Sequence, residues 1–485
     1  MRQKTKRVIL SLASVAFLFL LVAGSARAQA GVTAFPGSLP DGATYLIEVP
    51  ANWNGTLFLY SHGYVTPGSA NPAQDVGDPF TRAYMFSKGY ALAGSSYATT
   101  GWAIQQALPD QIAVLEQFKK MVGRPKRAIA WGHSLGGIIT AGLIQRNPET
   151  FDAALPMCGV LSGGVATWNT ALDSEFAFKT LLAPGSGLQL VNIANPAANL
   201  EIAEGALALA QGSAQGRARI ALSGALSNLP GWFTPLSPEP APTDFAGQET
   251  NQFFWDSEVD FPFVFAFRAE LEARAQGNVS WNTGVDYRIQ LDRSIGRAQV
   301  EALYQQAGLD LDADLKTLND TARISADPEA VHYLENNIIF DGRIHIPVLT
   351  LHTTGDGLVV VQNESAYKQI VDEEGNGDFL RRTFVSRAGH CAFTPAETIA
   401  AVETLITRLD TGRWHDVDAS DLNNAATAQG PAFNLFVTTQ GAVVPTPPAY
   451  IEFEPSPYLR PFDQLTADCH FGFFCGNPFL QFNQH

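Results

Sequence analysis

The stretch RAIAWGHSLGG, residues 127–137, decides the fold of this chain. Its first part, Arg127 to Trp131, is apolar enough for a buried strand, and the residues after Gly136 have the spacing of a helix that ends near Asn147. Between them stands Gly132-His133-Ser134-Leu135-Gly136, the Gly-x-Ser-x-Gly pattern of a nucleophile elbow. A strand that turns sharply into a helix at this pattern predicts that Ser134 is a nucleophile.

The elbow pattern has a physical reason. The sharp turn forces the serine into a strained backbone conformation, and the flanking glycines leave room for neighbouring segments. The helix that begins at Leu135 directs its free N–H groups and its dipole toward a developing anion. The same residues could instead be an ordinary helix start with a small-residue turn. Their place at a strand end, with suitable partners downstream, favours the nucleophile.

Strands and helices alternate on both sides of this elbow, which predicts a parallel sheet. The first two apolar runs, at 45–49 and 56–60, are separated by turn residues and are expected to pair with each other. The other expected strands are at 90–95, 151–157, 346–352 and 383–385, and the expected helices are at 105–122, 366–371 and 396–409.

Residues 161–342 interrupt the alternation and are expected to form a mainly helical cap. They are rich in Ala, Leu, Gln and Gly, and an aromatic stretch runs from Phe253 to Phe267. We expect this stretch to form the cap's own core rather than a wall against the substrate. The predicted domains are a core in two parts, 29–160 and 343–412, the cap between them, and a Pro- and Asn-rich extension at 413–485.

A serine hydroxyl is a weak nucleophile until a base takes its proton. His390 is the candidate base, because it follows the strand at 383–385 through a short flexible loop that can reach over the sheet. The alternative is an ordinary surface-loop histidine. His352 lies inside an apolar strand and is expected to be a packed core residue, whereas His62 and His133 flank the site in other roles.

The base in turn needs an acid that fixes its tautomer and stabilises the imidazolium. Asp356 lies just past the strand at 346–352, where a loop at the carboxyl edge of the sheet would place it near the base. Because Gly-Asp-Gly is also good turn chemistry, a turn-forming aspartate is the alternative. No acidic residue follows the strand ending at Met157 until Asp173, so the other usual position for the acid is empty.

The oxyanion needs preorganised donors, ideally backbone N–H groups. Leu135 N–H is one such donor by its position after the serine. Ser61-His62-Gly63-Tyr64 ends the strand at 56–60, and its glycine lets the loop fold back toward the elbow. Tyr64 N–H is therefore the predicted second donor, with a simple tight turn as the alternative.

The first 28 residues are expected to be a signal peptide that is cleaved near Ala28. Basic residues precede an apolar run from Val8 to Gly24, and Ala26-Arg27-Ala28 has the small-residue pattern of a cleavage site. An uncleaved anchor is the alternative, since the apolar run is near the lower limit for spanning a bilayer. Cleavage predicts a secreted or periplasmic protein with no stable membrane insertion.

The charge balance is acidic, with 31 basic and 47 acidic residues and a net charge of −16. Loss of the five basic residues of the signal would bring the mature chain to −21. Such a surface repels polyanions, so we expect neither nucleic acid nor an anionic membrane as a partner. The sequence has no His-x-x-x-His or His-Glu-x-x-His spacing and no Gly-rich phosphate loop, so we expect no metal and no cofactor.

The His62-Gly63 loop, the elbow at 132–136, Asp356 and Gly389-His390 together resemble the α/β-hydrolase superfamily, in the family's Ser, Asp, His order. The resemblance covers roughly residues 40–160 and 340–412. It implies an α/β fold with a mostly parallel, eight-stranded sheet and a cap inserted after strand six.

Four cysteines in an exported chain allow two disulfides in any of three connectivities. Cys469 and Cys475 are near enough in sequence for a local pair, which would leave Cys158 with Cys391. Tannases and feruloyl esterases join a cysteine beside the nucleophile to one directly after the catalytic histidine. Cys391 resembles the second of these, but His133 occupies the first position. The hypothesis is that Cys391 bonds Cys158 instead.

The predicted reaction is acyl transfer to water through an acyl-enzyme, with a small carboxylic ester as substrate. Esters need less leaving-group help than amides, and a broad aromatic-rich cap suits an apolar or aromatic part. A secreted aminopeptidase or prolyl-specific exopeptidase is the alternative enzyme. It would need an acidic clamp for a free amino terminus, for which Glu258 and Asp260 are candidates. The third alternative is a non-catalytic binding protein on the same fold, although such chains usually lose a triad member.

Overall fold

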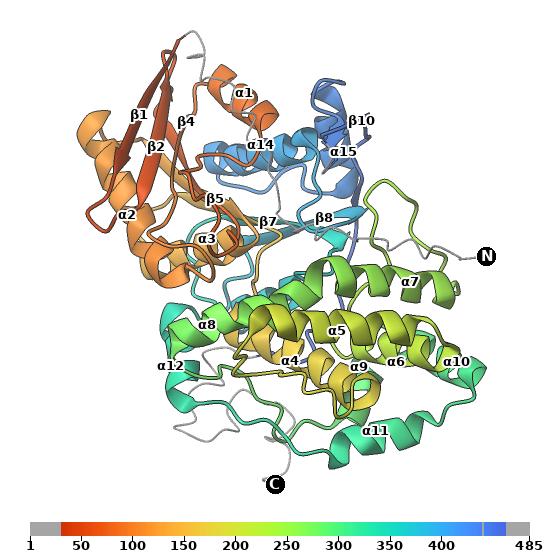
Figure 1. Ribbon diagram of the computed structural model, residues 1–485. Helices are drawn as coiled ribbons and strands as arrows, with labels where there is room; N and C mark the ends of the chain where they lie inside the picture. The colour runs from red at the N-terminus through yellow and green to blue at the C-terminus, as the bar shows by residue number, and fades with distance from the viewer. Residues whose placement is uncertain (1–30, 439–440, 462–485) are drawn as a thin grey trace, which may run out of the picture.

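The computed structural model describes residues 31–438 and 441–461. In this part of the chain, nine strands form one twisted sheet, drawn in Figure 1. Their order across the sheet is β1 (Val32–Ser38), β2 (Thr44–Pro50), β4 (Ala91–Ser95), β3 (Thr56–Ser61), β5 (Arg127–His133), β6 (Ala153–Met157), β7 (Val348–Gly355), β8 (Leu380–Ala388) and β11 (Tyr450–Ile451).

The centre of the sheet is parallel and its edges are antiparallel. From β4 to β8 each neighbouring pair is parallel, whereas β2 pairs with β4, β1 with β2 and β11 with β8 in antiparallel fashion. The strand order and the alternation with helices are those of the α/β-hydrolase fold, as the sequence predicted. The sheet has one strand more than the eight implied by the resemblance, because β11 of the extension pairs with β8 at Tyr450 and Val385.

One predicted pairing is wrong. The runs at 45–49 and 56–60 both form strands, β2 and β3, but they do not pair with each other. Strand β4 lies between them, antiparallel to β2 and parallel to β3. Adjacent runs in the sequence suggested a hairpin, but the crossover through helix α1 (Pro79–Ser87) inserts a later strand into that gap.

The central strands are buried on both faces, which explains their continuous apolar runs. Every residue of β3 is buried, and so is every residue of β6. On one face pack α2 (Ile104–Met121), α3 (Leu135–Arg146) and α13 (Asn363–Glu373), and on the other α1 and α14 (Pro395–Thr411). These two layers hold the carboxyl ends of the strands in fixed positions.

A further group of helices, separate from the two layers that flank the sheet, lies between β6 and β7 in the chain. Figure 1 shows these helices gathered on one side of the sheet. They are α4 (Gly163–Leu182), α5 (Pro196–Gln211), α6 (Ala214–Ala225), α7 (Phe245–Trp255), the π-helical segments η1 (Asp256–Asp260) and η2 (Phe263–Phe267), α8 (Arg268–Ala275), α9 (Tyr287–Arg293), α10 (Arg297–Ala307), α11 (Leu311–Asp320) and α12 (Pro328–Asn337). This group, called the cap below, has a hydrophobic core of its own.

The C-terminal segment packs on the rest of the chain. Helix α15 (Ala419–Ala428) contacts α14, and β9 (Leu435–Val437) pairs with β10 (Val443–Pro445) before the chain reaches β11. Beyond β11, the buried Arg460 side chain donates to both carboxylate oxygens of Asp173 in α4, at 3.0 Å, and to the Trp281 carbonyl at 2.9 Å. The extension therefore anchors the cap as well as the sheet.

The residues of the expected signal peptide lie outside the described part of the chain. Among the helices that are described, none is both long enough and apolar enough to cross a bilayer.

Candidate active site

Strand β5 turns into helix α3 at Ser134, as the elbow motif predicted. The serine has φ 59° and ψ −122°, a conformation that is strained for a residue with a side chain. A Cβ on Gly136 would lie 1.9 Å from the Ser61 carbonyl oxygen, and one on Gly132 would lie 2.4 Å from the same atom. Both glycines are therefore required by the close approach of β3 to the elbow.

Three side chains from three different loops meet at this point. The Ser134 hydroxyl donates to Nε2 of His390 at 2.7 Å, and Nδ1 of His390 donates to Oδ2 of Asp356 at 2.7 Å. Ser134 follows β5, Asp356 follows β7 and His390 follows β8, so each stands just past the carboxyl end of a strand. The structure thus brings together the three residues predicted as nucleophile, acid and base.

The acid of this trio is fully buried and held by several donors. Its side chain is 0% exposed, and its second oxygen accepts from the Val359 N–H at 2.9 Å. Burial alone would raise the pKa of Asp356, but the charge of His390 and the hydrogen bonds of His352 and His390 hold that pKa below its usual value. An ionised, oriented carboxylate behind the imidazole is what a general base requires.

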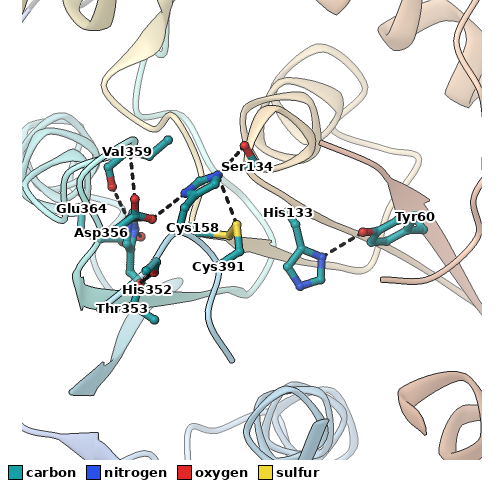
Figure 2. Close-up of a disulfide and its surroundings, with 12 residues drawn as sticks. Tyr60, His133, Ser134, Cys158, His352, Thr353, Asp356, Val359, Glu364 and Cys391 are labelled. Carbon is teal, nitrogen blue, oxygen red and sulfur yellow. Dashed lines mark hydrogen bonds and ion pairs between the residues drawn. A yellow bond between two sulfur atoms is a disulfide. The ribbon is translucent and has the colours of Figure 1, made fainter. Parts of the chain in front are cut away.

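His133, next to the nucleophile, is turned away from it. Its Nδ1 is 3.0 Å from the Tyr60 hydroxyl, and Figure 2 shows the two rings on the side of the elbow away from Asp356. Burial, helped by the charge of His390, lowers the pKa of His133 to about 4. At neutral pH this ring is uncharged and packs against the elbow, so it takes no part in the hydrogen-bond chain of Ser134.

The loop after β3 lies against the nucleophile. A Cβ on Gly63 would be 3.3 Å from Cβ of Ser134 and 3.8 Å from its Oγ, which puts the following peptide, and with it the Tyr64 N–H, beside the elbow. Within the described residues, no hydrogen bond is made by the N–H of Tyr64 or of Leu135. Both predicted oxyanion donors are therefore free to bind a substrate oxygen.

His62 fixes the conformation of this loop. Its Nδ1 is 2.7 Å from the Gly63 carbonyl and its Nε2 is 3.2 Å from the Ser96 carbonyl, while its ring stacks on Tyr97 at 3.9 Å. The Tyr97 hydroxyl donates to the His62 carbonyl at 3.0 Å. Because burial lowers the pKa of His62, this residue holds the loop as a neutral ring rather than as a second base.

A disulfide joins Cys158, at the end of β6, to Cys391, directly after the base, as the hypothesis stated. The bond lies under the imidazole, with the Cys391 sulfur 3.4 Å from Nε2 of His390 (Figure 2). It ties the loop of the base to the strand beside the nucleophile. The other expected pair, Cys469 and Cys475, lies outside the described residues.

The aromatic stretch of the cap divides into two sets. Phe261 and Phe265 are buried in the cap's own core, as predicted for the whole stretch. Phe263 and Phe267 instead pack against Tyr64, with ring centroids 5.0 Å and 6.0 Å away. The prediction is therefore wrong for this second set, because the π-helical segment turns one of its faces toward the loop after β3.

The cap also contacts the loops of the acid and the base. A Cβ on Gly357, the residue after Asp356, would lie 2.3 Å from the Trp255 ring. A Cβ on Gly389, the residue before the base, would lie 2.9 Å from Pro235. The cap therefore covers the site directly. Two of its segments, η1 and η2, are π-helical, and π-helical turns are frequent at functional sites.

Two acids of the cap lie near this contact. Asp256 is 4% exposed. Burial raises the pKa of Asp256 and of Asp260 well above the usual value, and the charge of Asp356 contributes at Asp260. Of the two candidates for an acidic clamp, Asp260 is thus close to the triad acid, whereas Glu258 is exposed on the same turn.

Cys158, His390 and Cys391 are the described residues whose ligand atoms cluster closely enough to hold a metal ion. Both sulfurs are engaged in the disulfide, and the imidazole is engaged by Asp356 and Ser134. The arrangement suits proton transfer rather than metal coordination.

Sequence reasoning missed one part of this site. His352 was expected to be a packed core residue, and it is fully buried, but its Nε2 is also 3.6 Å from Oδ2 of Asp356. Its Nδ1 donates to Glu364, which lies in α13. The spacing of four residues between His352 and Asp356 was the available signal, but across a strand end it does not predict contact.

Comparisons with known proteins found a family model, a curated relative and solved structures that are similar to this chain. The model of the prolyl oligopeptidase family matches residues 88–213, which include the elbow. An o-phthalyl amidase of Xanthobacter agilis is 29% identical, over 84% of this chain and 94% of that protein.

Among solved structures, an esterase from Aspergillus oryzae is 14% identical, with 79% of this chain and 81% of that chain covered and a TM-score of 0.38. An acylaminoacyl peptidase from Pyrococcus horikoshii is 10% identical with a TM-score of 0.33; the match covers 74% of this chain but 37% of the peptidase.

Proposed function

We propose that this chain, which has the α/β-hydrolase fold, is a serine hydrolase that cleaves carboxylic esters through a covalent acyl-enzyme on Ser134. The observation that carries the proposal is the hydrogen-bond chain from Ser134 through His390 to Asp356, with 2.7 Å at each link. A serine, an imidazole and a buried carboxylate in this order are the parts that activate a hydroxyl for acyl transfer.

In the first half of the reaction, Nε2 of His390 takes the proton of the Ser134 hydroxyl while Oγ attacks the substrate carbonyl carbon. The N–H groups of Tyr64 and Leu135 stabilise the negative charge on the carbonyl oxygen. The imidazolium then gives its proton to the departing alcohol oxygen. Asp356 stabilises the imidazolium throughout and stays ionised.

In the second half, a water molecule takes the place of the alcohol. Nε2 of His390 removes a proton from the water, whose oxygen attacks the acyl carbon. When the tetrahedral intermediate collapses, Ser134 Oγ leaves and recovers the proton from the imidazolium. The products are a carboxylic acid and the free enzyme, so neither metal nor cofactor is needed for the balance of the reaction.

Amides of aromatic carboxylic acids are a second candidate substrate class. The o-phthalyl amidase is similar to this chain along 94% of its own length, and its name describes an aromatic acyl group. The aromatic side chains of the cap that contact the loop after β3, Phe263 and Phe267, suit such a group. Esters remain the first candidate because they need less leaving-group assistance.

The test is steady-state hydrolysis by the mature chain of four substrates: 4-nitrophenyl butyrate, 4-nitrophenyl benzoate, an o-phthalyl 4-nitroanilide, and prolyl 4-nitroanilide. Ser134→Ala is compared with Ser69→Ala, a substitution of an exposed loop serine. We expect ester turnover that is lost with Ser134→Ala and kept with Ser69→Ala. Preference for the phthalyl anilide would move the assignment to an amidase, and preference for the prolyl anilide to a peptidase.

A fluorophosphonate probe distinguishes an enzyme from a binding protein on the same fold. Labelling that disappears in Ser134→Ala supports the hydrolase, because the probe reacts with an activated serine. A folded wild-type chain that is not labelled would instead favour the binding protein.

We also propose that the protein is exported after cleavage near Ala28. The basic and apolar pattern of residues 1–28 supports this, and so does the Cys158–Cys391 disulfide, since disulfides persist in oxidising compartments. The N-terminal sequence of the protein recovered from outside the cytoplasm tests it. A chain that keeps Met1 and stays in the cytoplasm would contradict export.

A further inference from the structure

A second histidine lies directly behind the acid of the triad. His352, in β7, is 0% exposed, and Figure 2 draws it beside Asp356. Its Nδ1 donates to Oε1 of Glu364 at 3.1 Å, and its Nε2 donates to the Val359 carbonyl at 2.8 Å, with Oδ2 of Asp356 3.6 Å away. Both ring nitrogens therefore face oxygen atoms that can only accept.

A histidine with acceptors at both nitrogens can satisfy them only when both nitrogens carry a proton, which makes the ring an imidazolium. Burial would lower the pKa of His352, but the hydrogen bonds and charges of Asp356 and Glu364 raise it to about 10. His62 is the useful contrast within the same site. Its nitrogens also face two carbonyl oxygens, yet burial lowers its pKa and the ring stays neutral, because no carboxylate is among its partners. Acceptors at both nitrogens are therefore not enough by themselves, and the two carboxylates beside His352 are what hold the charge.

The two carboxylates that stabilise the positive charge of His352 are themselves held in place. Oε2 of Glu364 accepts from the Thr350 hydroxyl at 2.6 Å, so the acid cannot turn away from His352. Asp356 is held by the Val359 N–H and by His390. In the cap, burial and the charges of Asp256 and Asp356 raise the pKa of Asp260, so a negative charge on Asp260 is disfavoured beside an ionised Asp356.

The five side chains form a continuous series, Glu364, His352, Asp356, His390 and Ser134. We propose that His352 is a positioning residue: a buried imidazolium that keeps Asp356 ionised and directed at His390. This proposal rests on the proposed role of the triad, since His352 acts only through Asp356. His352 touches neither the substrate nor the nucleophile.

Loss of this charge changes the pH dependence of the reaction in a definite direction. His352 and His390 approach the same oxygen of Asp356, at 3.6 Å and 2.7 Å, so their nitrogens are at most about 6 Å apart. A positive charge at that separation makes protonation of His390 less favourable. Removing the positive charge of His352 should therefore move the acidic limb of kcat/KM upward by about one pH unit. Loss of the negative charge of Glu364 would offset part of this shift.

The direct test reads the charge of the ring. In the mature Ser134→Ala chain labelled with ¹⁵N-histidine, we expect one histidine whose two ring nitrogens stay protonated from pH 6 to pH 9. If every histidine has an unprotonated ring nitrogen at pH 8, the proposal is overturned. This measurement needs neither activity nor a folded His352 variant. It is therefore independent of the proposed function, which fails instead if Ser134→Ala keeps full activity.

The functional test is the pH profile of kcat/KM for the preferred substrate. His352→Gln and the double variant H352Q/E364Q, which removes both charges and keeps amide groups, are compared with His345→Gln at an exposed position. We expect the acidic limb to move upward in the first two and to stay in place in the control. An unchanged limb in folded variants, or a downward shift, would overturn the proposal, because a purely structural role changes the amount of folded enzyme but not its pH profile.

Discussion

The disulfide between Cys158 and Cys391 should contribute both stability and activity. It closes a loop with a sequence separation of 233 residues, which includes the whole cap. In the chain-entropy model a loop of this length gives about 5 kcal/mol at 25 °C, and measured values for native disulfides are typically about 2–4 kcal/mol. We therefore expect the double substitution C158A/C391A to lower the free energy of unfolding by about 2–5 kcal/mol.

The same substitution should reduce kcat more than it raises KM. The bond ties His390 to the strand end beside Ser134, and both hydrogen bonds of the base depend on that position. A loosened imidazole spends less time aligned with the hydroxyl, which affects the chemical step rather than ground-state binding.

The assay is urea unfolding followed by tryptophan fluorescence, together with steady-state kinetics, for the wild type and C158A/C391A. The matched control is C469A/C475A, which removes the other two cysteines and leaves this bond intact. Equal unfolding free energies for wild type and C158A/C391A would refute the entropic argument. A full kcat in that variant would show that the loop of the base is held without the bond.

Substitutions at Gly136, Glu249 and Arg460 have predictable effects. Gly136→Ala should abolish activity and destabilise the fold by about 3 kcal/mol or more, because its Cβ would lie 1.9 Å from a backbone oxygen; Gly205→Ala, where nothing lies within 4 Å, should be neutral or stabilising in thermal unfolding. Burial raises the pKa of Glu249 to about 7, so its protonated form favours folding and that stability is lost as pH rises from about 4.5 to 7. Glu249→Gln should therefore stabilise the protein by about 1–2 kcal/mol at pH 8 and not at pH 4 in urea titrations; an equal effect at both values would contradict the assignment. Arg460→Met should cost about 3–5 kcal/mol in the same titrations, because it leaves the carboxylate of Asp173 buried without its cation, and Asp173→Asn in the same chain should recover most of that loss.

The sequence predicted which residues meet at the candidate site, because the signals for them lie in short segments. The elbow needs glycines on both sides of Ser134, and a strand before it and a helix after it, all within a few residues. Asp356 and His390 each follow an apolar strand, and parallel strands end at one edge of the sheet. Local pattern and sheet geometry together were therefore enough to bring these three residues together.

The sequence alone could not give the contacts that join distant segments. Strand β4 enters between β2 and β3, and β11 adds to the sheet from the extension, because pairing depends on how the whole chain crosses over. The same holds for the aromatic stretch of the cap, whose two sets of rings face different neighbours.

The sequence by itself predicted the class of fold and the three residues, Ser134, His390 and Asp356, that the structure brings together. The tertiary structure alone decided that His352 stands behind Asp356 with Glu364, and that the cap covers the site through Trp255 and Phe263. The physical reason is that a residue's identity sets what it can donate or accept, whereas its charge state and its partners depend on which atoms folding brings within a few ångströms.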